Sequence, residues 1–275
     1  MTTPQDIQRK TADAYSAASD TYDHPANSFW ERYGRRTVDR LQLLIGARVL
    51  DVCCGSGASA LPAAEAVGPT GFVLGVDLAE SLLELARSKA EQRGLTNVEF
   101  RKGDMLDLKL PESSFDAVVC VFGIFFVQDM HLAMNNLARL VRPGGKLAIT
   151  TWGPRFFEPA SSAFWNSIRA VRPDLYKGFN PWDRISEPDA VRALFDGVGV
   201  EKLEVVAEDG VHSLSSGEDW WAAIRGSGYR GTLEQLNAED LEQVRQTNLD
   251  FIRQNNVRAV ESNVVYAVGV RSAPK

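Results

Sequence analysis

Short apolar segments alternate with amphipathic ones through the middle of the chain. Five strands are predicted, at Arg48–Cys53, Phe72–Asp77, Asn97–Gly103, Phe115–Phe122 and Lys146–Trp152. Strands of this kind, separated by helices, are typical of parallel βαβ units, in which both faces of the sheet are buried.

Three segments between these strands have the spacing of amphipathic helices. They cover Ala58–Val67, Leu78–Gly94 and His131–Val141, and the second ends at a glycine, as helices commonly do. The sequence Arg142-Pro-Gly-Gly after the third predicts a turn into the fifth strand.

The two ends of the chain depart from this rhythm. Residues 1–45 are predicted to form an N-terminal helical lid that packs on the rest of the molecule and has no core of its own. Residues 46–275 are predicted to form one domain, with an aromatic-rich insertion at about 153–186 and a helical segment at about 218–256.

Two late strands complete the predicted sheet. After a helix at Glu187–Phe195, strands are expected at Val200–Val206 and within Ser262–Arg271. The pattern therefore predicts an α/β fold: a Rossmann-like, seven-stranded, mostly parallel sheet with helices on both faces and a final antiparallel strand.

The composition and net charge limit the classes of molecule that the protein is expected to bind. The 275 residues are 44% hydrophobic and carry a formal net charge of −6, and the sequence pI is about 5.2. No basic field is present to attract phosphate backbones, so a nucleic-acid partner is not expected. A small-molecule partner is expected instead, and a homodimer is the hypothesis for the assembly.

Targeting and metal signals are also missing from the pattern. The polar start lacks a secretory apolar core, and the apolar run VVCVFGIFFV is too short to cross a bilayer. Cys53, Cys54 and Cys120 show neither a disulfide framework nor metal-ligand spacing. We therefore expect a cytoplasmic protein without an integral membrane segment and without a bound metal.

The first strand runs into a glycine turn, Val49-Leu-Asp-Val-Cys-Cys-Gly-Ser-Gly57. Glycines at a strand-to-helix turn let a ligand approach the backbone and meet free N–H groups. Asp51, just before the turn, is placed to orient a cationic ammonium, directly or through water.

Carboxylates follow the next two strands. Asp77 at the end of the second strand can accept hydrogen bonds from both hydroxyls of a ribose. Asp104, after the third, can accept from an adenine amino group while the backbone N–H of Met105 donates to the ring. Either aspartate alone could equally be a helix N-cap. As a series at the carboxyl ends of strands, they favour a nucleotide-like ligand.

The segments VLDVCCGSG, GVDLAESLL, GDM, FDAVVCVFG and LVRPGGKL occur in the order and spacing of class I methyltransferases that use S-adenosylmethionine (SAM). Over about residues 46–152 the chain most resembles the group that includes the ubiquinone and menaquinone C-methyltransferases. This resemblance implies SAM as the cofactor, S-adenosylhomocysteine (SAH) as its product, and methyl transfer as the reaction.

The resemblance also implies roles for individual residues. The methionine part of SAM is expected against Asp51, Cys53, Cys54, Gly55, Ser56 and Gly57, with the backbone near Cys120 facing its ammonium. Asp77 with Leu78 is expected to hold the ribose, and Asp104 with Met105 the adenine. Tyr22, in a Tyr-Asp pair like the one that helps to close the site of quinone methyltransferases, completes the set.

Catalytic and acceptor-binding residues carry weaker signals. Many relatives have a histidine after the fourth strand, where this chain has Phe125-Phe126. His24, beside Tyr22 in the predicted lid, is the candidate general base, and Tyr22 the second candidate. The predicted acceptor pocket consists of Phe122, Phe125, Trp152, Phe156, Phe179 and Trp182.

Two other functions fit part of the pattern. Gly55-x-Gly57-x-x-Ala60 formally matches the fingerprint of a dinucleotide-dependent oxidoreductase, with Asp77 on the ribose. A non-catalytic SAM-binding protein of the same fold would keep the same motifs. The favoured function is transfer of the methyl group of SAM to a small, apolar or aromatic acceptor, with C-, O- and N-methylation all open.

Overall fold

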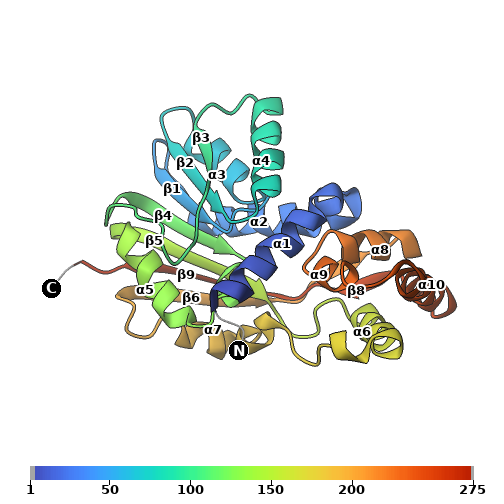
Figure 1. Ribbon diagram of the computed structural model, residues 1–275. Coiled ribbons are helices and arrows are strands. Elements are labelled where there is room, and N and C mark those ends of the chain that lie inside the picture. The colour runs from blue at the N-terminus through green and yellow to red at the C-terminus, as the bar shows by residue number, and fades with distance from the viewer. Residues whose placement is uncertain (1–3, 274–275) are drawn as a thin grey trace.

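The computed structural model describes residues 4–273, with side chains from residue 8 onward. Its centre is one seven-stranded sheet (Figure 1). The strands are β1 (Arg48–Val52), β2 (Phe72–Asp77), β3 (Val98–Lys102), β4 (Phe115–Val121), β5 (Val141–Trp152), β6 (Val200–Glu208) and β9 (Val264–Arg271). They lie in the order β3-β2-β1-β4-β5-β9-β6.

Only β9 runs against its neighbours. It pairs antiparallel with both β5 and β6, whereas β3, β2, β1, β4 and β5 pair in parallel. The central strands are nearly continuous runs of buried apolar residues, as a sheet covered on both faces requires. The predicted α/β fold class is confirmed, including the final antiparallel strand.

Helices cover both faces of this sheet. One face carries α2 (Phe29–Leu41) and α3 (Ala60–Val67), which contact each other, together with α4 (Glu80–Gln92). The other carries α5 (Met130–Leu140) against β4 and β5, and α7 (Pro188–Ala193) against β6 and β9 (Figure 1). The order of helices and strands thus follows from the alternating pattern of the sequence.

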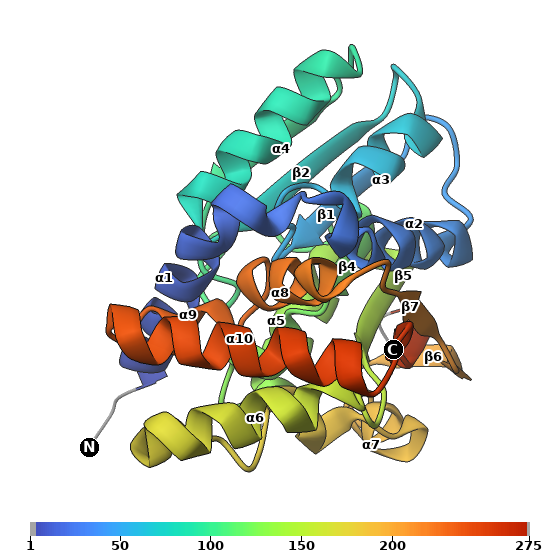
Figure 2. The same cartoon turned by 90° about the vertical axis from the view of Figure 1, so that its right-hand side faces the viewer.

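A second group of helices lies beyond the carboxyl ends of the strands. It consists of α1 (Pro4–Tyr22), α6 (Ala160–Val171), α8 (Gly217–Arg225), α9 (Arg230–Leu233) and α10 (Ala238–Gln254). The first helix of the chain contacts α8 and α9, and α10 contacts α6 and α8 (Figure 2). A small antiparallel sheet of β7 (Val211–Ser213) and β8 (Ala259–Glu261) joins this group.

The aromatic-rich insertion predicted at about 153–186 contains α6, in which Phe164 and Ile168, one helical turn apart, are both fully buried. Two other local predictions need correction. The predicted turn at 142–145 lies inside β5, where the pairing with β4 is irregular between Phe115 and Ala117. The long helical stretch near the carboxyl end is divided into α8, α9 and α10.

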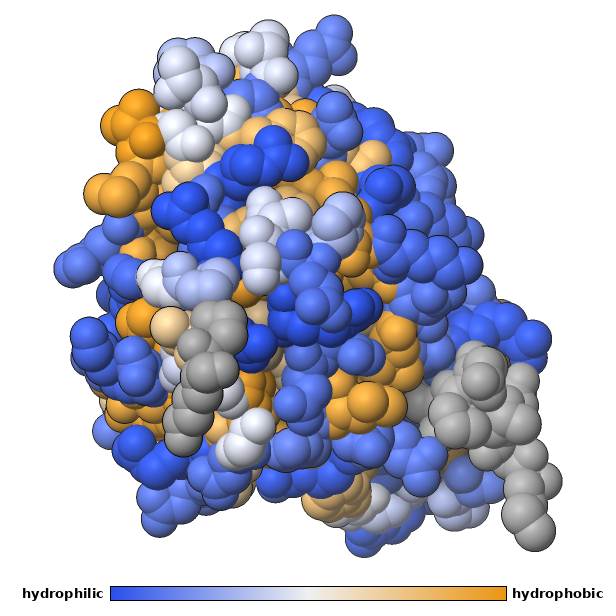
Figure 3. All heavy atoms as spheres, turned by 90° about the vertical axis from the view of Figure 1, so that its left-hand side faces the viewer, coloured by the Kyte–Doolittle hydropathy of each residue, from blue (hydrophilic) through white to orange (hydrophobic). Residues whose placement is uncertain are grey.

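Part of the surface is apolar. On the face shown in Figure 3, hydrophobic residues lie interspersed among polar ones. Leu44 and Ile45, between α2 and β1, are among the most exposed large hydrophobic side chains. In the part of the chain that the structure describes, no helix has the length and apolar character needed to cross a bilayer.

Candidate functional site

A cavity of about 890 Å³, its open mouth included, lies at the carboxyl ends of the parallel strands. Its floor is built by residues that follow β1, β2, β3 and β4, and its roof by α1. Cys53, Cys54, Gly55, Asp77, Asp104 and Phe122 are among the floor residues. Open α/β sheets bind their ligands at this edge, because the strand order reverses there and leaves a crevice.

The turn after β1 has the backbone shape that its glycines suggested. Cys53, Gly55 and Gly57 all have positive φ, at 60°, 52° and 88°. A side chain at Gly55 would come within 3.1 Å of the Tyr22 hydroxyl, so glycine is needed where the turn meets the roof. Cys53 adopts this strained conformation without being glycine, which is a feature of functional turns.

The expectation of free N–H groups at this turn needs correction. The Gly55 N–H donates to Asp77 Oδ2 at 2.9 Å, and the Gly57 N–H donates to the carbonyl of Cys54 at 2.8 Å. The turn therefore satisfies these amides internally. Its bond to Asp77 ties the end of β2 to the end of β1 and fixes the position of that carboxylate.

Asp51 lies behind the cavity wall and is completely buried. Ser59 Oγ donates to its Oδ2 at 2.7 Å, while Oδ1 has no partner among the described residues. Burial raises the pKa of Asp51 to about 7, the nearby charge of Asp77 adds to the rise, and the bond from Ser59 opposes it. A buried carboxylate oxygen without a partner is suited to receive a cation.

Asp77 and Asp104 both line the cavity and both accept backbone hydrogen bonds from the residue two positions on. Asp77 Oδ1 accepts from Ala79, and Asp104 Oδ1 accepts from Leu106, each at 2.9 Å. These are the cap-like contacts that the sequence left as an alternative. A carboxylate has about four acceptor positions, so these bonds leave capacity for a ligand. Burial raises the pKa of Asp77.

Asp104 has a second partner that comes from the roof. Gln8 Nε2, on α1, donates to Asp104 Oδ1 at 3.2 Å. This contact joins the first turns of the chain to the end of β3 across the cavity mouth. The roof and the floor are therefore connected by a hydrogen bond at one of the predicted ligand carboxylates.

The predicted cofactor residues fall into two groups. Tyr22, Cys53, Cys54, Gly55, Asp77, Leu78, Asp104 and Met105 line the cavity. Asp51, Ser56, Gly57 and Cys120 lie behind this lining. Ser56 Oγ donates to Asp23 Oδ1 at 2.7 Å and accepts from Lys89 at 2.8 Å, so it ties the chain after α1 to α4.

The thiols of the floor are protonated. The Cys53 thiol contacts the Cys120 thiol, and this bond, together with burial, raises the pKa of Cys53 well above its usual value. Burial raises the pKa of Cys54 in the same way. All three cysteines are free, and no metal-binding cluster of three or more His, Cys, Asp or Glu side chains exists within the described residues.

Of the six aromatic residues predicted to form the acceptor pocket, only Phe122 lines the cavity. Trp152 stacks behind it with ring centroids 3.7 Å apart, and Phe156 stacks on Trp152 at 3.9 Å. These two side chains belong to the core that supports the cavity. The structure therefore places Trp152 and Phe156 one layer behind the cavity lining, and contact of either with the acceptor stays a prediction.

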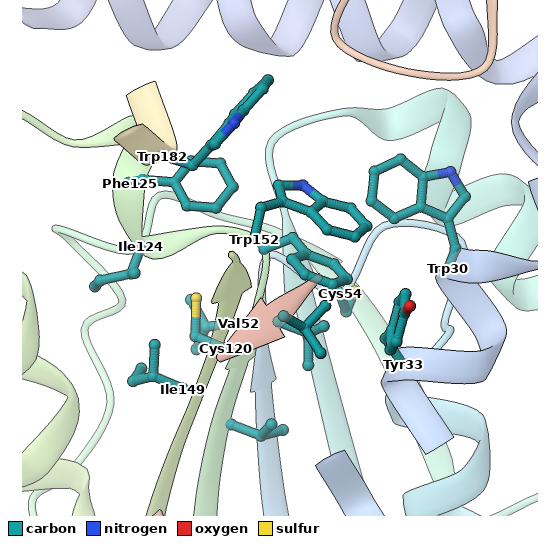
Figure 4. Packing of buried hydrophobic residues seen from close by; sticks show 14 of the residues in the cluster. Trp30, Tyr33, Val52, Cys54, Cys120, Ile124, Phe125, Ile149, Trp152 and Trp182 are labelled. Atoms are coloured by element: carbon teal, nitrogen blue, oxygen red, sulfur yellow. The ribbon is translucent and has the colours of Figure 1, made fainter. Parts of the chain in front are cut away.

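The remaining three predicted aromatic residues, Phe125, Phe179 and Trp182, also lie outside the cavity lining. Phe125 and Trp182 are buried against each other at 5.7 Å, and Trp152 lies between this pair and Trp30 (Figure 4). Phe179 is 57% exposed and lies in a loop away from the cavity. An aromatic-rich segment therefore did not mark the pocket, since most of its rings pack into the hydrophobic core.

His24 does not reach the cavity. It is exposed at the start of a short 3-10 helix (Pro25–Asn27), where its Nδ1 accepts the backbone N–H of Ala26 at 3.1 Å. This local cap explains the position of His24 beside Tyr22 without a catalytic role. The geometry therefore argues against His24 as the general base, whereas Tyr22 lines the cavity as expected.

Sequence reasoning missed the residues of the roof. Gln8, Thr11, Ala12 and Tyr15 line the cavity from α1. Their spacing of three and four residues places them on one face of a helix, which is the signal that could have selected them. Trp30, Phe126 and Val127 add apolar surface to the same space.

Comparisons with known proteins agree with this geometry. A family described as "Methyltransferase domain" matches residues 49–145. The aklanonic acid methyltransferase DauC from Streptomyces sp. (strain C5) is 34% identical over 208 residues, which are 71% of this chain and 94% of that protein. The demethylmenaquinone methyltransferase from Listeria welshimeri is 36% identical over 150 residues, 54% of this chain and 63% of that protein.

Solved structures show the same fold. The YcgJ protein from Bacillus subtilis superposes with a TM-score of 0.59 at 20% identity, over 88% of this chain and 100% of that chain. A SAM-dependent methyltransferase from Aquifex aeolicus gives a TM-score of 0.54 at 23% identity, over 70% of this chain and 91% of that chain. At these identities the likeness concerns the fold alone.

Proposed function

The chain belongs to the class I SAM-dependent methyltransferases, close to the ubiquinone and menaquinone group, and we propose that its methyl acceptor is a small, apolar or aromatic molecule bound under α1. The observation that carries this proposal is the cavity itself. Asp77 and Asp104 stand on its floor, Asp51 lies directly behind it, and rings and aliphatic side chains form much of the rest.

The residues present fit SAM. The partnerless Oδ1 of Asp51 would receive the ammonium of the methionine part, where a cation satisfies an otherwise unpaired buried carboxylate. Asp77 would hold the ribose hydroxyls with the lone pairs that Gly55 and Ala79 leave free. Asp104 and Met105 would hold the adenine. Each assignment uses a side chain whose position is fixed by a hydrogen bond or by burial.

When bound, SAM supplies a methyl group that its sulfonium makes electrophilic, so the protein need supply little covalent chemistry. The work left to the chain is to orient the acceptor and to exclude water. Trp30, Phe122 and Phe126 supply apolar walls, and α1 closes the space from above. We propose that α1 performs the covering role predicted for residues 1–45, since α2 packs on one face of the sheet.

The cavity offers no ionised thiol or phenol at neutral pH. Burial raises the pKa of Cys54 and of Tyr22 well above their usual values. We propose that the acceptor reacts after losing its proton to solvent or in a form that is already anionic. This proposal accommodates C-, O- and N-methylation.

The named relatives guide the choice of acceptor class. They are a demethylmenaquinone methyltransferase, an aklanonic acid methyltransferase and, 38% identical over 129 residues, the nocamycin O-methyltransferase from Saccharothrix syringae. The net charge of −6 supports the further proposal that the acceptor is not a nucleic acid. The homodimer and the cytoplasmic location stay predictions.

Thermal-shift titration followed by a labelled-methyl screen tests the proposal. SAM and SAH should raise the unfolding temperature and NAD should not, because only ligands that bind the folded state stabilise it. Labelled SAM incubated with metabolite extracts should then label a small molecule, identified by its mass. Stabilisation by NAD alone would favour an oxidoreductase. Binding of SAM without any labelled product would favour a non-catalytic protein.

A further inference from the structure

Tyr15, like Thr11 and Tyr22, is a residue of α1 that brings a hydroxyl group into the cavity. Its side chain lines the cavity together with Phe126, whose ring lies 5.6 Å away in a T-shaped contact. The ring of Tyr22 makes a second T-shaped contact at 6.2 Å. Two aromatic neighbours therefore hold the Tyr15 ring in one orientation.

The oxygen of Tyr15 lies beside the backbone of Gly228, just before α9. A β-carbon built at Gly228 would come within 3.4 Å of this oxygen. A phenol has one proton and can accept bonds at its lone pairs. Since Tyr15 lines the cavity, its proton can be donated to an acceptor atom of a bound ligand.

The surroundings of Tyr15 also keep its phenol protonated, so that it can donate a hydrogen bond. Burial, with the nearby Asp77 and Cys53, raises the pKa of Tyr15 well above its usual value. The phenol therefore stays protonated and cannot act as a base at neutral pH. A buried hydroxyl group gains most from a ligand atom that accepts a hydrogen bond.

The position of Tyr15 distinguishes the acceptor from the cofactor. Apart from Tyr22, the last residue of α1, the polar groups assigned to SAM lie at the strand ends, on the floor of the cavity or behind it, whereas Tyr15 lies in the roof. On the proposed function above, the space between the roof and the bound cofactor belongs to the methyl acceptor.

We infer that Tyr15 donates a hydrogen bond to an oxygen atom of the methyl acceptor and thereby selects flat, oxygen-bearing molecules, such as aromatic ketones, enols or carboxylic acids, over hydrocarbons of the same shape. Tyr15 is then a specificity-determining residue of the reaction. This inference rests on the proposed function, because it requires SAM or SAH on the floor of the cavity.

Fluorenone and fluorene test the inference, since these planar molecules share a ring skeleton and differ in the carbonyl oxygen. Their affinities are measured by equilibrium dialysis against SAH-saturated protein. The wild type should bind fluorenone about fivefold more tightly than fluorene, the effect of one buried hydrogen bond. Tyr15→Phe, which keeps the ring, should bind both equally. Tyr176→Phe, outside the cavity lining, should behave as the wild type.

Three results would overturn the inference. The first is equal binding of the two probes by the wild type, including no binding of either. The second is a preference for fluorenone that survives in Tyr15→Phe. The third is a loss of SAH affinity in Tyr15→Phe, which would assign the phenol to the cofactor. The melting temperature of Tyr15→Phe with SAH shows that the variant is folded. Failure of the wild type to bind SAH would instead refute the proposed function.

Discussion

The affinity for SAM should depend on pH through Asp51. This carboxyl is completely buried and its pKa is about 7, chiefly because burial penalises the charged form. Below that pH the group is protonated in the free protein, yet it must be ionised to pair with an ammonium. Each pH unit below about 7 should therefore weaken binding about tenfold, or by about 1.4 kcal/mol.

Asp51→Asn removes this ionisation while keeping the size of the side chain. At pH values above 7 the variant should bind SAH less tightly by about 1.5–3 kcal/mol, the contribution of a hydrogen bond to a charged group. Its affinity should no longer change between about pH 5 and pH 7, where the α-amino group of the ligand stays protonated. Isothermal titration calorimetry of both proteins across this range measures the two slopes.

Asp51→Asn should weaken ligand binding but increase the stability of the ligand-free protein above pH 7. The pKa of Asp51 is raised from 3.8 to about 7 on folding, so its contribution favours the folded state at low pH and is lost as the pH rises through 7. The difference of about 3 units sets an upper limit of about 4 kcal/mol. Ligand-free Asp51→Asn should therefore unfold at a higher temperature than the wild type above pH 7.

Either of two results would refute this reasoning. One is a wild-type SAH affinity that is constant through pH 7. The other is the same pH slope in Asp51→Asn, which would assign the titration to a different group. Equal stability of the ligand-free proteins above pH 7 would show that the buried carboxyl is not penalised.

Three other outcomes follow from the geometry of the site. Asp77→Ala should weaken SAM binding by about 1.5–3 kcal/mol through the loss of its charged hydrogen bonds, and unchanged affinity in calorimetry would remove Asp77 from the cofactor site. His24→Ala should leave turnover and its pH profile unchanged, because His24 lies outside the cavity, so a lost pH-dependent limb would restore it as the base. Trp152→Ala should lower the free energy of unfolding by about 3–5 kcal/mol, whereas Phe179→Ala, at an exposed position, should leave it almost unchanged. Equal denaturation midpoints of the two variants would contradict the assignment of Trp152 to the core.

Strand ends were predictable because they are local features of the chain. β2 was predicted at its observed bounds, and the other central strands to within a residue or two, apart from the start of β5. In a parallel sheet the residues after successive strands must meet at one edge. The positions of Asp77 and Asp104 in the cavity were therefore determined by the sequence pattern.

The roles of the aromatic residues depended on packing that no local pattern describes. Phe122, Trp152 and Phe156 form one continuous stack, and only the first of them reaches the cavity. An aromatic side chain in the core has the same hydrophobicity and ring size as one in a pocket wall, so the sequence cannot distinguish the two. Which residue is exposed to the cavity depends on how far each strand extends and on what covers it.

The sequence by itself determined the sheet, the glycine turn and the strand-end aspartates, since these follow from periodicity and from the geometry of βαβ units. Only the tertiary structure decided the roof, in which Gln8 Nε2 donates to Asp104 Oδ1 across 96 residues of chain and Tyr15 lies beside Gly228. Such contacts arise because α1 packs against α8 and α9, and a helix face can be matched to its partner only when both are in place.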